Sequence, residues 1–162
     1  MIGGQAVSLH SEPRYTKDFD LWVGADKRNA HRLYTVLREF GAPTDAISPE
    51  DLATPGTIFI FGLEPNRVDI LTRVKGATFE NSYKRRLRIA LNTVTVNFVC
   101  LDDLIKIKRA TGRPQDLIDL KNLLQTKAIR AARAKKSTKI PVNSKSPVAS
   151  KIPVATRRKS AN

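Results

Sequence analysis

Two aspartates, Asp18 and Asp20, lie one residue apart inside the apolar segment DFDLWV, residues 18–23. Aspartate is disfavoured in β-strands, yet the alternating apolar side chains of this segment predict a strand. Side chains at positions i and i+2 of a strand point to the same face, so the two carboxylates lie side by side. Like charges in that arrangement repel each other unless a cation lies between them. The segment therefore predicts a charged site on one face of a strand.

A glycine pair and a third strand aspartate fit the same chemistry. Gly3 and Gly4 precede a segment predicted to be a short helix, residues 5–12. Glycine lets backbone N–H groups approach a phosphate closely, and a helix N-terminus attracts anions. Asp69 lies in the apolar strand RVDILTRV, residues 67–74. If this strand runs beside residues 18–23 in the same direction, three carboxylates come together, and a pair of Mg²⁺ ions requires such ligands.

The pattern of residues 1–126 predicts a mixed α/β (α+β) domain, in which a small mixed sheet is flanked by helices and followed by two C-terminal helices. Besides residues 5–12, the expected helices are 27–40, 48–53, 79–86, 101–112 and 113–134. Two strand pairs are expected, 57–63 with 67–74 and 86–91 with 93–99. Asp26 and Gly41 are the expected caps of helix 27–40. Its expected apolar face is Ala30, Leu33, Val36, Leu37 and Phe40, and that of the last helix is Leu117, Leu120, Leu123 and Leu124.

The order of these motifs resembles a known superfamily. A Gly-Gly turn, a short helix, PRYTKDFDLWV and a later strand aspartate in RVDIL are similar to the nucleotidyltransferase superfamily that includes DNA polymerase β. The segment LDDLIKIKRATGRPQDLIDLKNL, residues 101–123, resembles the small bacterial nucleotidyltransferases related to AbiEii-type toxins of toxin–antitoxin systems. In those proteins a Lys/Arg helix and a GRPQDLxDL helix follow the catalytic half. The resemblance covers about residues 2–125.

The resemblance implies transfer of a nucleoside monophosphate from an NTP to an acceptor hydroxyl, with pyrophosphate leaving. Gly3 and Gly4 would hold the triphosphate, Asp18 and Asp20 would bind two Mg²⁺ ions, and Asp69 would bind the catalytic ion and help to activate the acceptor. Mn²⁺ is an alternative metal. A tRNA end, a protein hydroxyl and a small molecule are all open as acceptors, and an antitoxin is an implied partner. Further candidates for phosphate or acceptor contacts are Arg14, Thr16, Lys108 and Arg113.

The family pattern also has a helix and an apolar strand before the glycines. Only Met1 and Ile2 precede them in this sequence. Those two elements are therefore expected to be missing from the domain at residues 1–126, and the native gene product is expected to begin upstream of Met1.

Each candidate residue also has a structural interpretation. Asp69 could pair with Arg67 or Arg73 across a surface strand, without binding a metal. The basic residues of helix 101–112 could form only its solvated face. His10 and His31 are expected to be packing or surface residues, because no second His or Cys lies at zinc-binding spacing. The lone Cys100 is expected to be a small buried apolar residue. A second function class therefore stays open, a non-catalytic nucleic-acid-binding protein with a degenerate nucleotidyltransferase fold.

The positive charge of the chain is concentrated at its C-terminus. The net charge is +14, and eleven of the 29 basic residues but none of the 15 acidic ones lie in residues 127–162. This tail is expected to begin as helix and then to be disordered, because it has few large apolar side chains. It could be a solubilising extension or a nucleic-acid tether.

The cysteine content and the hydropathy of the chain indicate in which compartment the protein is expected. With one cysteine, no disulfide can form within the chain, which is typical of a reducing compartment. No apolar run approaches the length that crosses a bilayer. A cytoplasmic location and no membrane partner are expected.

Deletion of residues 127–162 tests the role of the tail. We expect little change in melting temperature, because the segment contributes few apolar side chains to a core. If the tail contacts RNA, the salt dependence of RNA binding should also become shallower, by roughly 0.7 in the log–log slope for each phosphate that the tail neutralises. Thermal melts and RNA titrations at several salt concentrations measure both effects. An unchanged slope would assign the tail a solubilising role.

Overall fold

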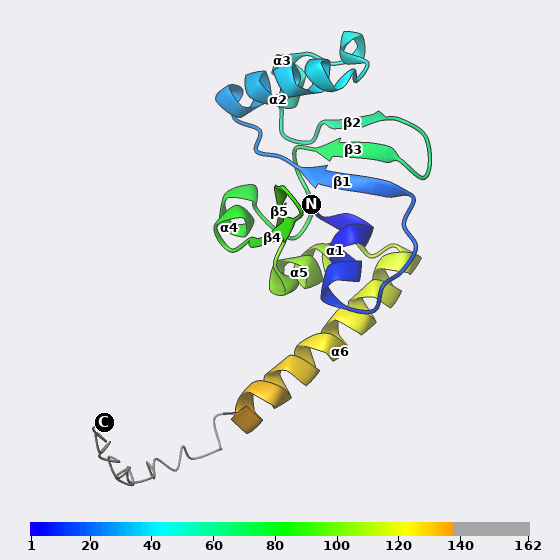
Figure 1. The fold of residues 1–162 in the computed structure, drawn as a ribbon, viewed down its shortest axis with the longest axis vertical. Helices are drawn as coiled ribbons and strands as arrows, with labels where there is room; N and C mark the ends of the chain where they lie inside the picture. The colour runs from blue at the N-terminus through cyan, green and yellow to red at the C-terminus, as the bar shows by residue number, and fades with distance from the viewer. Residues whose placement is uncertain (138–162) are drawn as a thin grey trace, which may run out of the picture.

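Residues 1–137 are described by a computed structural model, and they have the expected α+β architecture (Figure 1). The helices are α1 (Gly3–His10), α2 (Lys27–Phe40), α3 (Pro49–Leu52), α4 (Phe79–Lys84), α5 (Leu101–Thr111) and α6 (Pro114–Ser137), with a 3₁₀ turn, η1, at Thr44–Ala46. The strands are β1 (Asp18–Trp22), β2 (Ile58–Phe61), β3 (Arg67–Leu71), β4 (Leu87–Leu91) and β5 (Val94–Phe98). The predicted elements are therefore confirmed, with ends that differ by a few residues.

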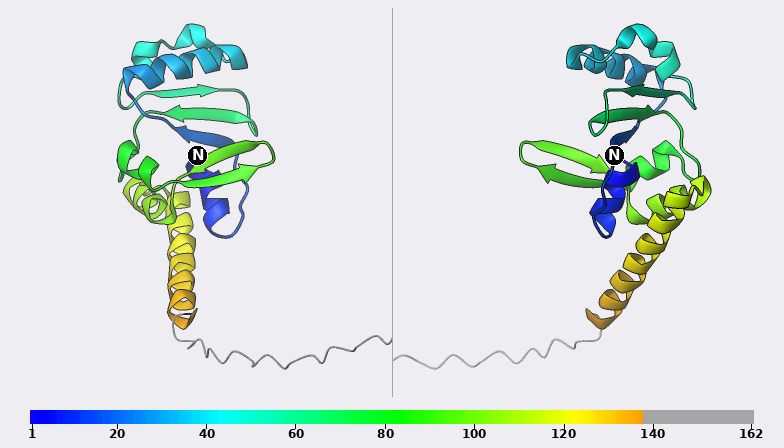
Figure 2. Two further views of the ribbon diagram at one scale, coloured as in Figure 1. Left: turned by 60° about the vertical axis from the view of Figure 1, so that its left-hand side comes forward. Right: turned by 90° about the vertical axis from the view of Figure 1, so that its right-hand side faces the viewer.

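The central sheet is mixed and has the strand order β1-β3-β2. Strand β1 runs parallel to β3, whereas β2 and β3 form the predicted antiparallel hairpin. Strands β4 and β5 form the second predicted hairpin as a separate two-stranded sheet, which projects from the body of the molecule (Figure 2). The parallel pairing places Asp20 directly opposite Asp69.

Two apolar clusters lie on opposite faces of the central sheet. On one face, α2 and α3 pack against the inward side chains of the sheet, with Leu37, Leu52, Phe59 and Ile70 buried. On the other face, α1, α5, α6 and the β4–β5 hairpin enclose a second cluster around Val7, Leu104 and Leu123. Because strand side chains alternate, the residues of β3 that do not face α2 and α3 point toward this second layer. Asp69 lies on that side.

The predicted caps of α2 are present, and α3 is capped as well. The Asp26 carboxylate accepts a hydrogen bond from the Asn29 N–H at 2.9 Å, and Gly41 ends α2 in the left-handed conformation. In α3, Ser48 and Asp51 form a capping box, and Pro49 occupies the first helical position.

The predicted apolar faces of two helices were partly wrong. In α2, Val36 and Phe40 are exposed, because the buried stripe consists of Ala30, Leu33, Tyr34 and Leu37. In α6, Leu117 and Leu124 are exposed. The inward face of α6 instead carries Asp116 and Asp119 beside Leu120 and Leu123. Two acidic residues take those positions because a buried lysine of α5 pairs with them.

The structure also bears on the predictions for His10, Cys100 and the C-terminal tail. His10 is buried and its Nε2 lies 2.8 Å from the carbonyl oxygen of Val99, so the packing interpretation is confirmed. Cys100 is only half-buried and its thiol donates to Asp103, so it is not a purely apolar residue. Residues Lys127–Ser137 continue α6 as the expected helical start of the tail, whereas the segment expected to be disordered lies outside the described residues. Within residues 1–137, no helix combines the length and apolarity needed to cross a membrane.

Met1 and Ile2 link the central sheet to the β4–β5 hairpin. The Ile2 N–H donates to the Asp20 carbonyl at 2.9 Å, and the Val99 N–H donates to the Met1 carbonyl at 3.1 Å. The Met1 ammonium donates to the Asn97 carbonyl at 2.7 Å. This short extended segment places the start of α1 directly beside β1.

Gly76 and Gly41 give a matched test of the contact between the loop after β3 and α5. Both have positive φ angles, +86° and +83°, but a Cβ at Gly76 would lie 2.6 Å from the Lys106 carbonyl oxygen, whereas one at Gly41 would meet nothing within 4 Å. We expect Gly41→Ala to lower the free energy of unfolding by about 1 kcal/mol through backbone strain. Gly76→Ala should cost at least about 2 kcal/mol more, because α5 must also move. Urea titrations measure both losses, and equal losses would show that the contact with α5 is unimportant.

Candidate active site

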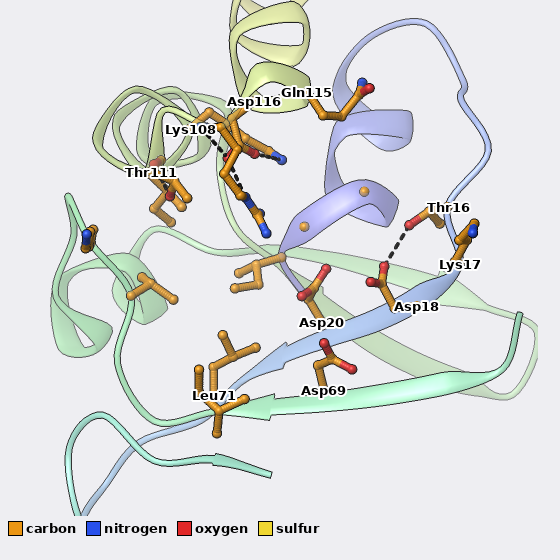
Figure 3. Close-up of a pocket in the computed structure, with 18 of the residues that line it drawn as sticks. Thr16, Lys17, Asp18, Asp20, Asp69, Leu71, Lys108, Thr111, Gln115 and Asp116 are labelled. Atoms are coloured by element: carbon orange, nitrogen blue, oxygen red, sulfur yellow. Dashed lines mark hydrogen bonds and ion pairs between the residues drawn. The ribbon is translucent and has the colours of Figure 1, made fainter. Parts of the chain in front are cut away.

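A cleft of about 800 Å³ lies between the central sheet and the layer formed by α1, α5 and the start of α6 (Figure 3). Its floor is the face of β1 and β3 that carries the aspartates. Basic side chains outnumber acidic ones along the cleft. The basic lining residues are Arg14, Lys17, Arg67, Arg73, Lys75, Lys108 and Arg113, and the acidic ones are Asp18, Asp20, Asp69 and Asp116.

The strand aspartates, Asp18, Asp20 and Asp69, come together on the floor of this cleft (Figure 3). Asp20 and Asp69 are direct partners across the parallel β1–β3 pair, and Asp18 lies two residues earlier on the same face of β1. The predicted proximity of the two aspartate-bearing strands is therefore confirmed. The Thr16 hydroxyl donates to one oxygen of Asp18 at 2.9 Å and orients that carboxylate.

The guanidinium of Arg67 pairs with two of the strand aspartates. Its Nη2 atom lies 2.8 Å from Asp18 Oδ2 and 3.1 Å from Asp69 Oδ2, and its Nε atom lies 2.8 Å from Asp69 Oδ1. The structural interpretation of Asp69 as a partner of Arg67 is thus also observed. One protein cation thus lies between Asp18 and Asp69, whereas the repulsion predicted from the sequence concerned Asp18 and Asp20.

Asp20 has no such partner among the described residues, and its charged form is disfavoured. Burial, followed by the neighbouring charges of Asp18 and Asp69, raises the pKa of Asp20 above its ordinary value. The more distant Lys108 and Arg113 oppose this shift. Asp20 is therefore the group in the cleft that would gain most from an additional cation.

Gly3 and Gly4 allow α1 to lie directly against the strand aspartates. A Cβ on Gly3 would clash with the Asp20 carboxylate, and a Cβ on Gly4 would clash with Thr16. Gly3 also has a φ angle of +62°, which an L side chain rarely adopts. Within residues 1–137, the backbone N–H groups of both glycines lack a hydrogen-bond partner, and the N-cap residue Ile2 provides no side-chain cap. Unpaired N–H groups at a helix N-terminus are the donors that anions bind.

The roof of the cleft is held by the Lys108 network, which we define as Lys108, Asp116, Asp119, Arg14 and Arg113. The Lys108 Nζ atom is buried and lies 2.7 Å from Asp116 Oδ1 and 2.8 Å from Asp119 Oδ2. Arg14 binds both oxygens of Asp119, at 2.8 and 3.0 Å, and Arg113 Nε binds Asp116 at 2.8 Å. The network ties α5 and α6 to the loop between α1 and β1.

The two carboxyls of the Lys108 network are strongly stabilised in their charged forms. Burial by itself raises the pKa of Asp119, but hydrogen bonds from Arg14 and Lys108 outweigh burial and hold that pKa below its ordinary value. Burial likewise raises the pKa of Asp116, and the bonds from Arg113 and Lys108 reverse the shift. Both acids are therefore charged at neutral pH.

Two cations of the cleft have no acidic partner among the described residues, Arg73 and Lys75. They lie on the loop after β3, which is fixed at both ends. The Thr72 hydroxyl donates to the Thr54 carbonyl at 2.7 Å and accepts from the Gly56 N–H at 2.9 Å. At the other end Gly76 packs directly against α5. The loop thus presents uncompensated positive charge to the cleft.

The donors on the cleft floor fit Mg²⁺ or Mn²⁺ by type. Carboxylate oxygens are the ligands that hard divalent cations prefer, and the pKa of Asp20 is raised by burial and then by the charges of Asp18 and Asp69 beside it. Within residues 1–137, however, no three acidic, imidazole or thiol side chains already converge as a metal centre. Arg67 lies between Asp18 and Asp69 instead. The donors therefore fit the ions by ligand type, and a protein cation occupies the space between two of them.

All nine predicted site residues line this one cleft, although six of them make side-chain contacts within the protein, among them Asp18 and Asp69 with Arg67. Arg14, Lys108 and Arg113 belong to the Lys108 network, and Thr16 binds Asp18. The expectation of a solvated helix face was wrong for Lys108, which is buried, whereas Lys106 and Arg109 are exposed. Sequence reasoning missed the acidic partners Asp116 and Asp119. Their spacing of three residues, in phase with Leu120 and Leu123, was the available signal.

We compared the chain with known protein families and with curated proteins. No family model matches the chain, and no curated protein is found to be significantly similar to it. The resemblance to nucleotidyltransferases therefore rests on the order of residues in the sequence.

Asp119→Asn tests the Lys108 network. The variant leaves Lys108 buried with one acidic partner, so we expect the free energy of unfolding to fall by about 3 kcal/mol at pH 7. The folded-state pKa of Asp119 is lowered, so its contribution is complete above the unfolded pKa of about 3.9 and is lost as the pH falls below that value. The difference between variant and parent should therefore be constant from pH 7 to 5 and shrink below about pH 4.

Asp102→Asn is the matched control for this prediction. Asp102 also pairs with a lysine, Lys127, at 2.8 Å, but both side chains are exposed. We expect a loss below about 1 kcal/mol. Urea titrations across the pH range measure both variants, and equal losses would contradict a special role for the buried network.

Proposed function

We propose that this protein is a metal-dependent nucleotidyltransferase that moves a nucleoside monophosphate from an NTP to an acceptor hydroxyl. The observation that carries the proposal is the parallel pairing of β1 with β3, which sets Asp20 opposite Asp69 beside the open N-terminus of α1. Carboxylates and unpaired N–H groups suit the two components of a metal–nucleotide complex. The carboxylates bind cations, and the N–H groups bind phosphate oxygens.

The proposed roles follow the positions in the cleft. Asp18, Asp20 and Asp69 hold two divalent ions, whose chemistry is to stabilise the attacking and leaving oxygens of the displacement. Gly3 and Gly4 donate to the triphosphate through their backbone. Arg73 and Lys75, which have no acidic partner among residues 1–137, attract the anionic substrate and the leaving pyrophosphate.

The Lys108 network has a supporting role in this proposal. Arg14, Lys108 and Arg113 are engaged by Asp116 and Asp119, so they shape the roof of the cleft rather than supply free charge. By fixing the loop before β1, the network also fixes Thr16 and, through it, the orientation of Asp18. A role in a toxin–antitoxin system belongs to the same proposal and rests on the resemblance of residues 101–123.

A second candidate is a non-catalytic nucleic-acid-binding protein. The observation that favours it is the pairing of Arg67 with Asp18 and Asp69, which neutralises acidic charge in a cleft with an excess of basic residues. The basic C-terminal tail would act in the same direction. The two candidates differ in chemistry, because only the first predicts NTP-dependent labelling of an acceptor.

Asparagine substitutions of the strand aspartates test the enzymatic proposal. Asp18→Asn, Asp20→Asn and Asp69→Asn each remove a charged ligand with little change of shape, so nucleotidyl transfer should fall by about a hundredfold or more. The losses should not add in double variants, because the groups act as a unit. Incubation of full-length protein with each labelled NTP, Mg²⁺ and a cell extract detects the transfer and its acceptor.

Stability separates a functional role of Asp20 from a structural one. Because the pKa of Asp20 is raised, its charge destabilises the metal-free fold at neutral pH, and Asp20→Asn should raise the melting temperature. This gain should begin to shrink as the pH falls through the raised pKa of the folded state and should vanish below the unfolded pKa of about 3.9. Asp45→Asn, at an exposed position of η1, is the control, and it should change neither the melting temperature nor its dependence on pH. Wild-type transfer in all three strand variants would overturn the proposed role of these aspartates, and the absence of NTP-dependent labelling by the parent would favour the binding protein.

A further inference from the structure

Arg67 occupies the position between Asp18 and Asp69 that a divalent ion would need. A single nitrogen atom, Nη2, lies within 3.1 Å of both carboxylates, and Nε adds a second bond to Asp69. The Arg67 side chain is 31% exposed, whereas those of Asp18 and Asp69 are 25% and 13% exposed. The guanidinium is therefore in contact with solvent as well as with the carboxylates.

An alternative acidic partner for Arg67 lies just outside the strand aspartates. Glu64 Oε1 is 3.8 Å from the other terminal nitrogen, Nη1, and Glu64 Oε2 accepts from Lys17 at 3.0 Å. Arginine side chains rotate rapidly when they are partly exposed. A small rotation would bring the guanidinium into full contact with Glu64 without leaving its charge unpaired.

We propose that Arg67 is a built-in counter-ion of the site, which competes with divalent metal ions for Asp18 and Asp69 and moves toward Glu64 when they bind. The proposal rests on the proposed function, because it concerns the same metal ions. In the metal-free protein, Arg67 relieves the repulsion between the strand aspartates. It also lowers the apparent metal affinity, because only the fraction of molecules with Arg67 withdrawn can bind the ions.

The same competition links metal binding to the nucleotide. Phosphate oxygens offer a guanidinium strong, charge-assisted hydrogen bonds. A nucleotide in the cleft therefore stabilises the withdrawn position of Arg67, as Glu64 does, and favours binding of the metal. Because such coupling is reciprocal, the metal ion also strengthens binding of the nucleotide. The site is then complete only when both the metal ion and the nucleotide are bound.

Direct titration of Mn²⁺, followed by electron paramagnetic resonance of the free ion, tests the proposal without any catalytic readout. We expect Arg67→Gln to bind Mn²⁺ about tenfold more tightly than the parent, because the competing cation is gone. Arg73→Gln is the matched control, since it removes the same charge from the same cleft but contacts none of the strand aspartates. Arg73→Gln should change the Mn²⁺ affinity by no more than about threefold, because it alters only the long-range electrostatic potential of the cleft.

Glu64→Gln supplies a second, independent measurement. If Glu64 acts by receiving Arg67, its substitution should weaken Mn²⁺ binding a few-fold in the parent and have no effect in the Arg67→Gln background. An equal effect in both backgrounds would mean that Glu64 acts on the ion directly and would overturn the exchange between Glu64 and the site.

The outcomes also distinguish this inference from the proposed function. Mn²⁺ bound with equal affinity by the parent and Arg67→Gln, or changed no more than by Arg73→Gln, would overturn the role of Arg67 and leave the metal site intact. Failure of the parent, Arg67→Gln and Arg73→Gln to bind Mn²⁺ would overturn both the metal site and the inference. Thermal melts of the metal-free variants confirm that each protein is folded.

Discussion

The buried ammonium of Lys108 is the interaction on which the architecture of the cleft depends. A charge removed from water is costly unless it is paired, and Lys108 is paired with both Asp116 and Asp119. Those two acids in turn hold Arg14 and Arg113, so one buried cation organises contacts among α5, α6 and the loop before β1. The energetic benefit lies less in stability than in geometry, since a hydrophobic replacement would hold the helices but would not fix the loop that carries Thr16 and leads to Asp18.

On the floor of the cleft, the parallel register of β1 and β3 brings together carboxylates that are not fully paired. There, three acidic groups share one face of the sheet, and Arg67 is the only cation among the described residues that pairs with any of them. Asp20 has none and its pKa is raised. The cleft thus combines a satisfied ionic roof with an incompletely compensated acidic floor. An imbalance of this kind is typical of functional sites, where a ligand supplies the missing charge.

The sequence predicted much of this fold because its local signals agree with one another. Asp26 and Gly41 at the ends of α2, and the Ser48–Asp51 capping box of α3, act through bonds a few residues apart and do not depend on distant packing. The apolar faces were less predictable. Phe40 and Leu117 fit a helical stripe yet are exposed, because which side of a helix is buried depends on the partner that covers it.

What the sequence by itself determined is which chemical groups are available: two aspartates on one face of a predicted strand, a third aspartate in a later strand, and a glycine pair before a short helix. These follow from alternation in a strand and from the size of a side chain, which are local properties. Only the tertiary structure decided how the charges are paired. Lys108 with Asp116 and Asp119, and Arg67 with Asp18 and Asp69, are chosen by strand register and helix packing. Coulomb attraction selects partners by distance in space, and spacing along the chain does not define that distance.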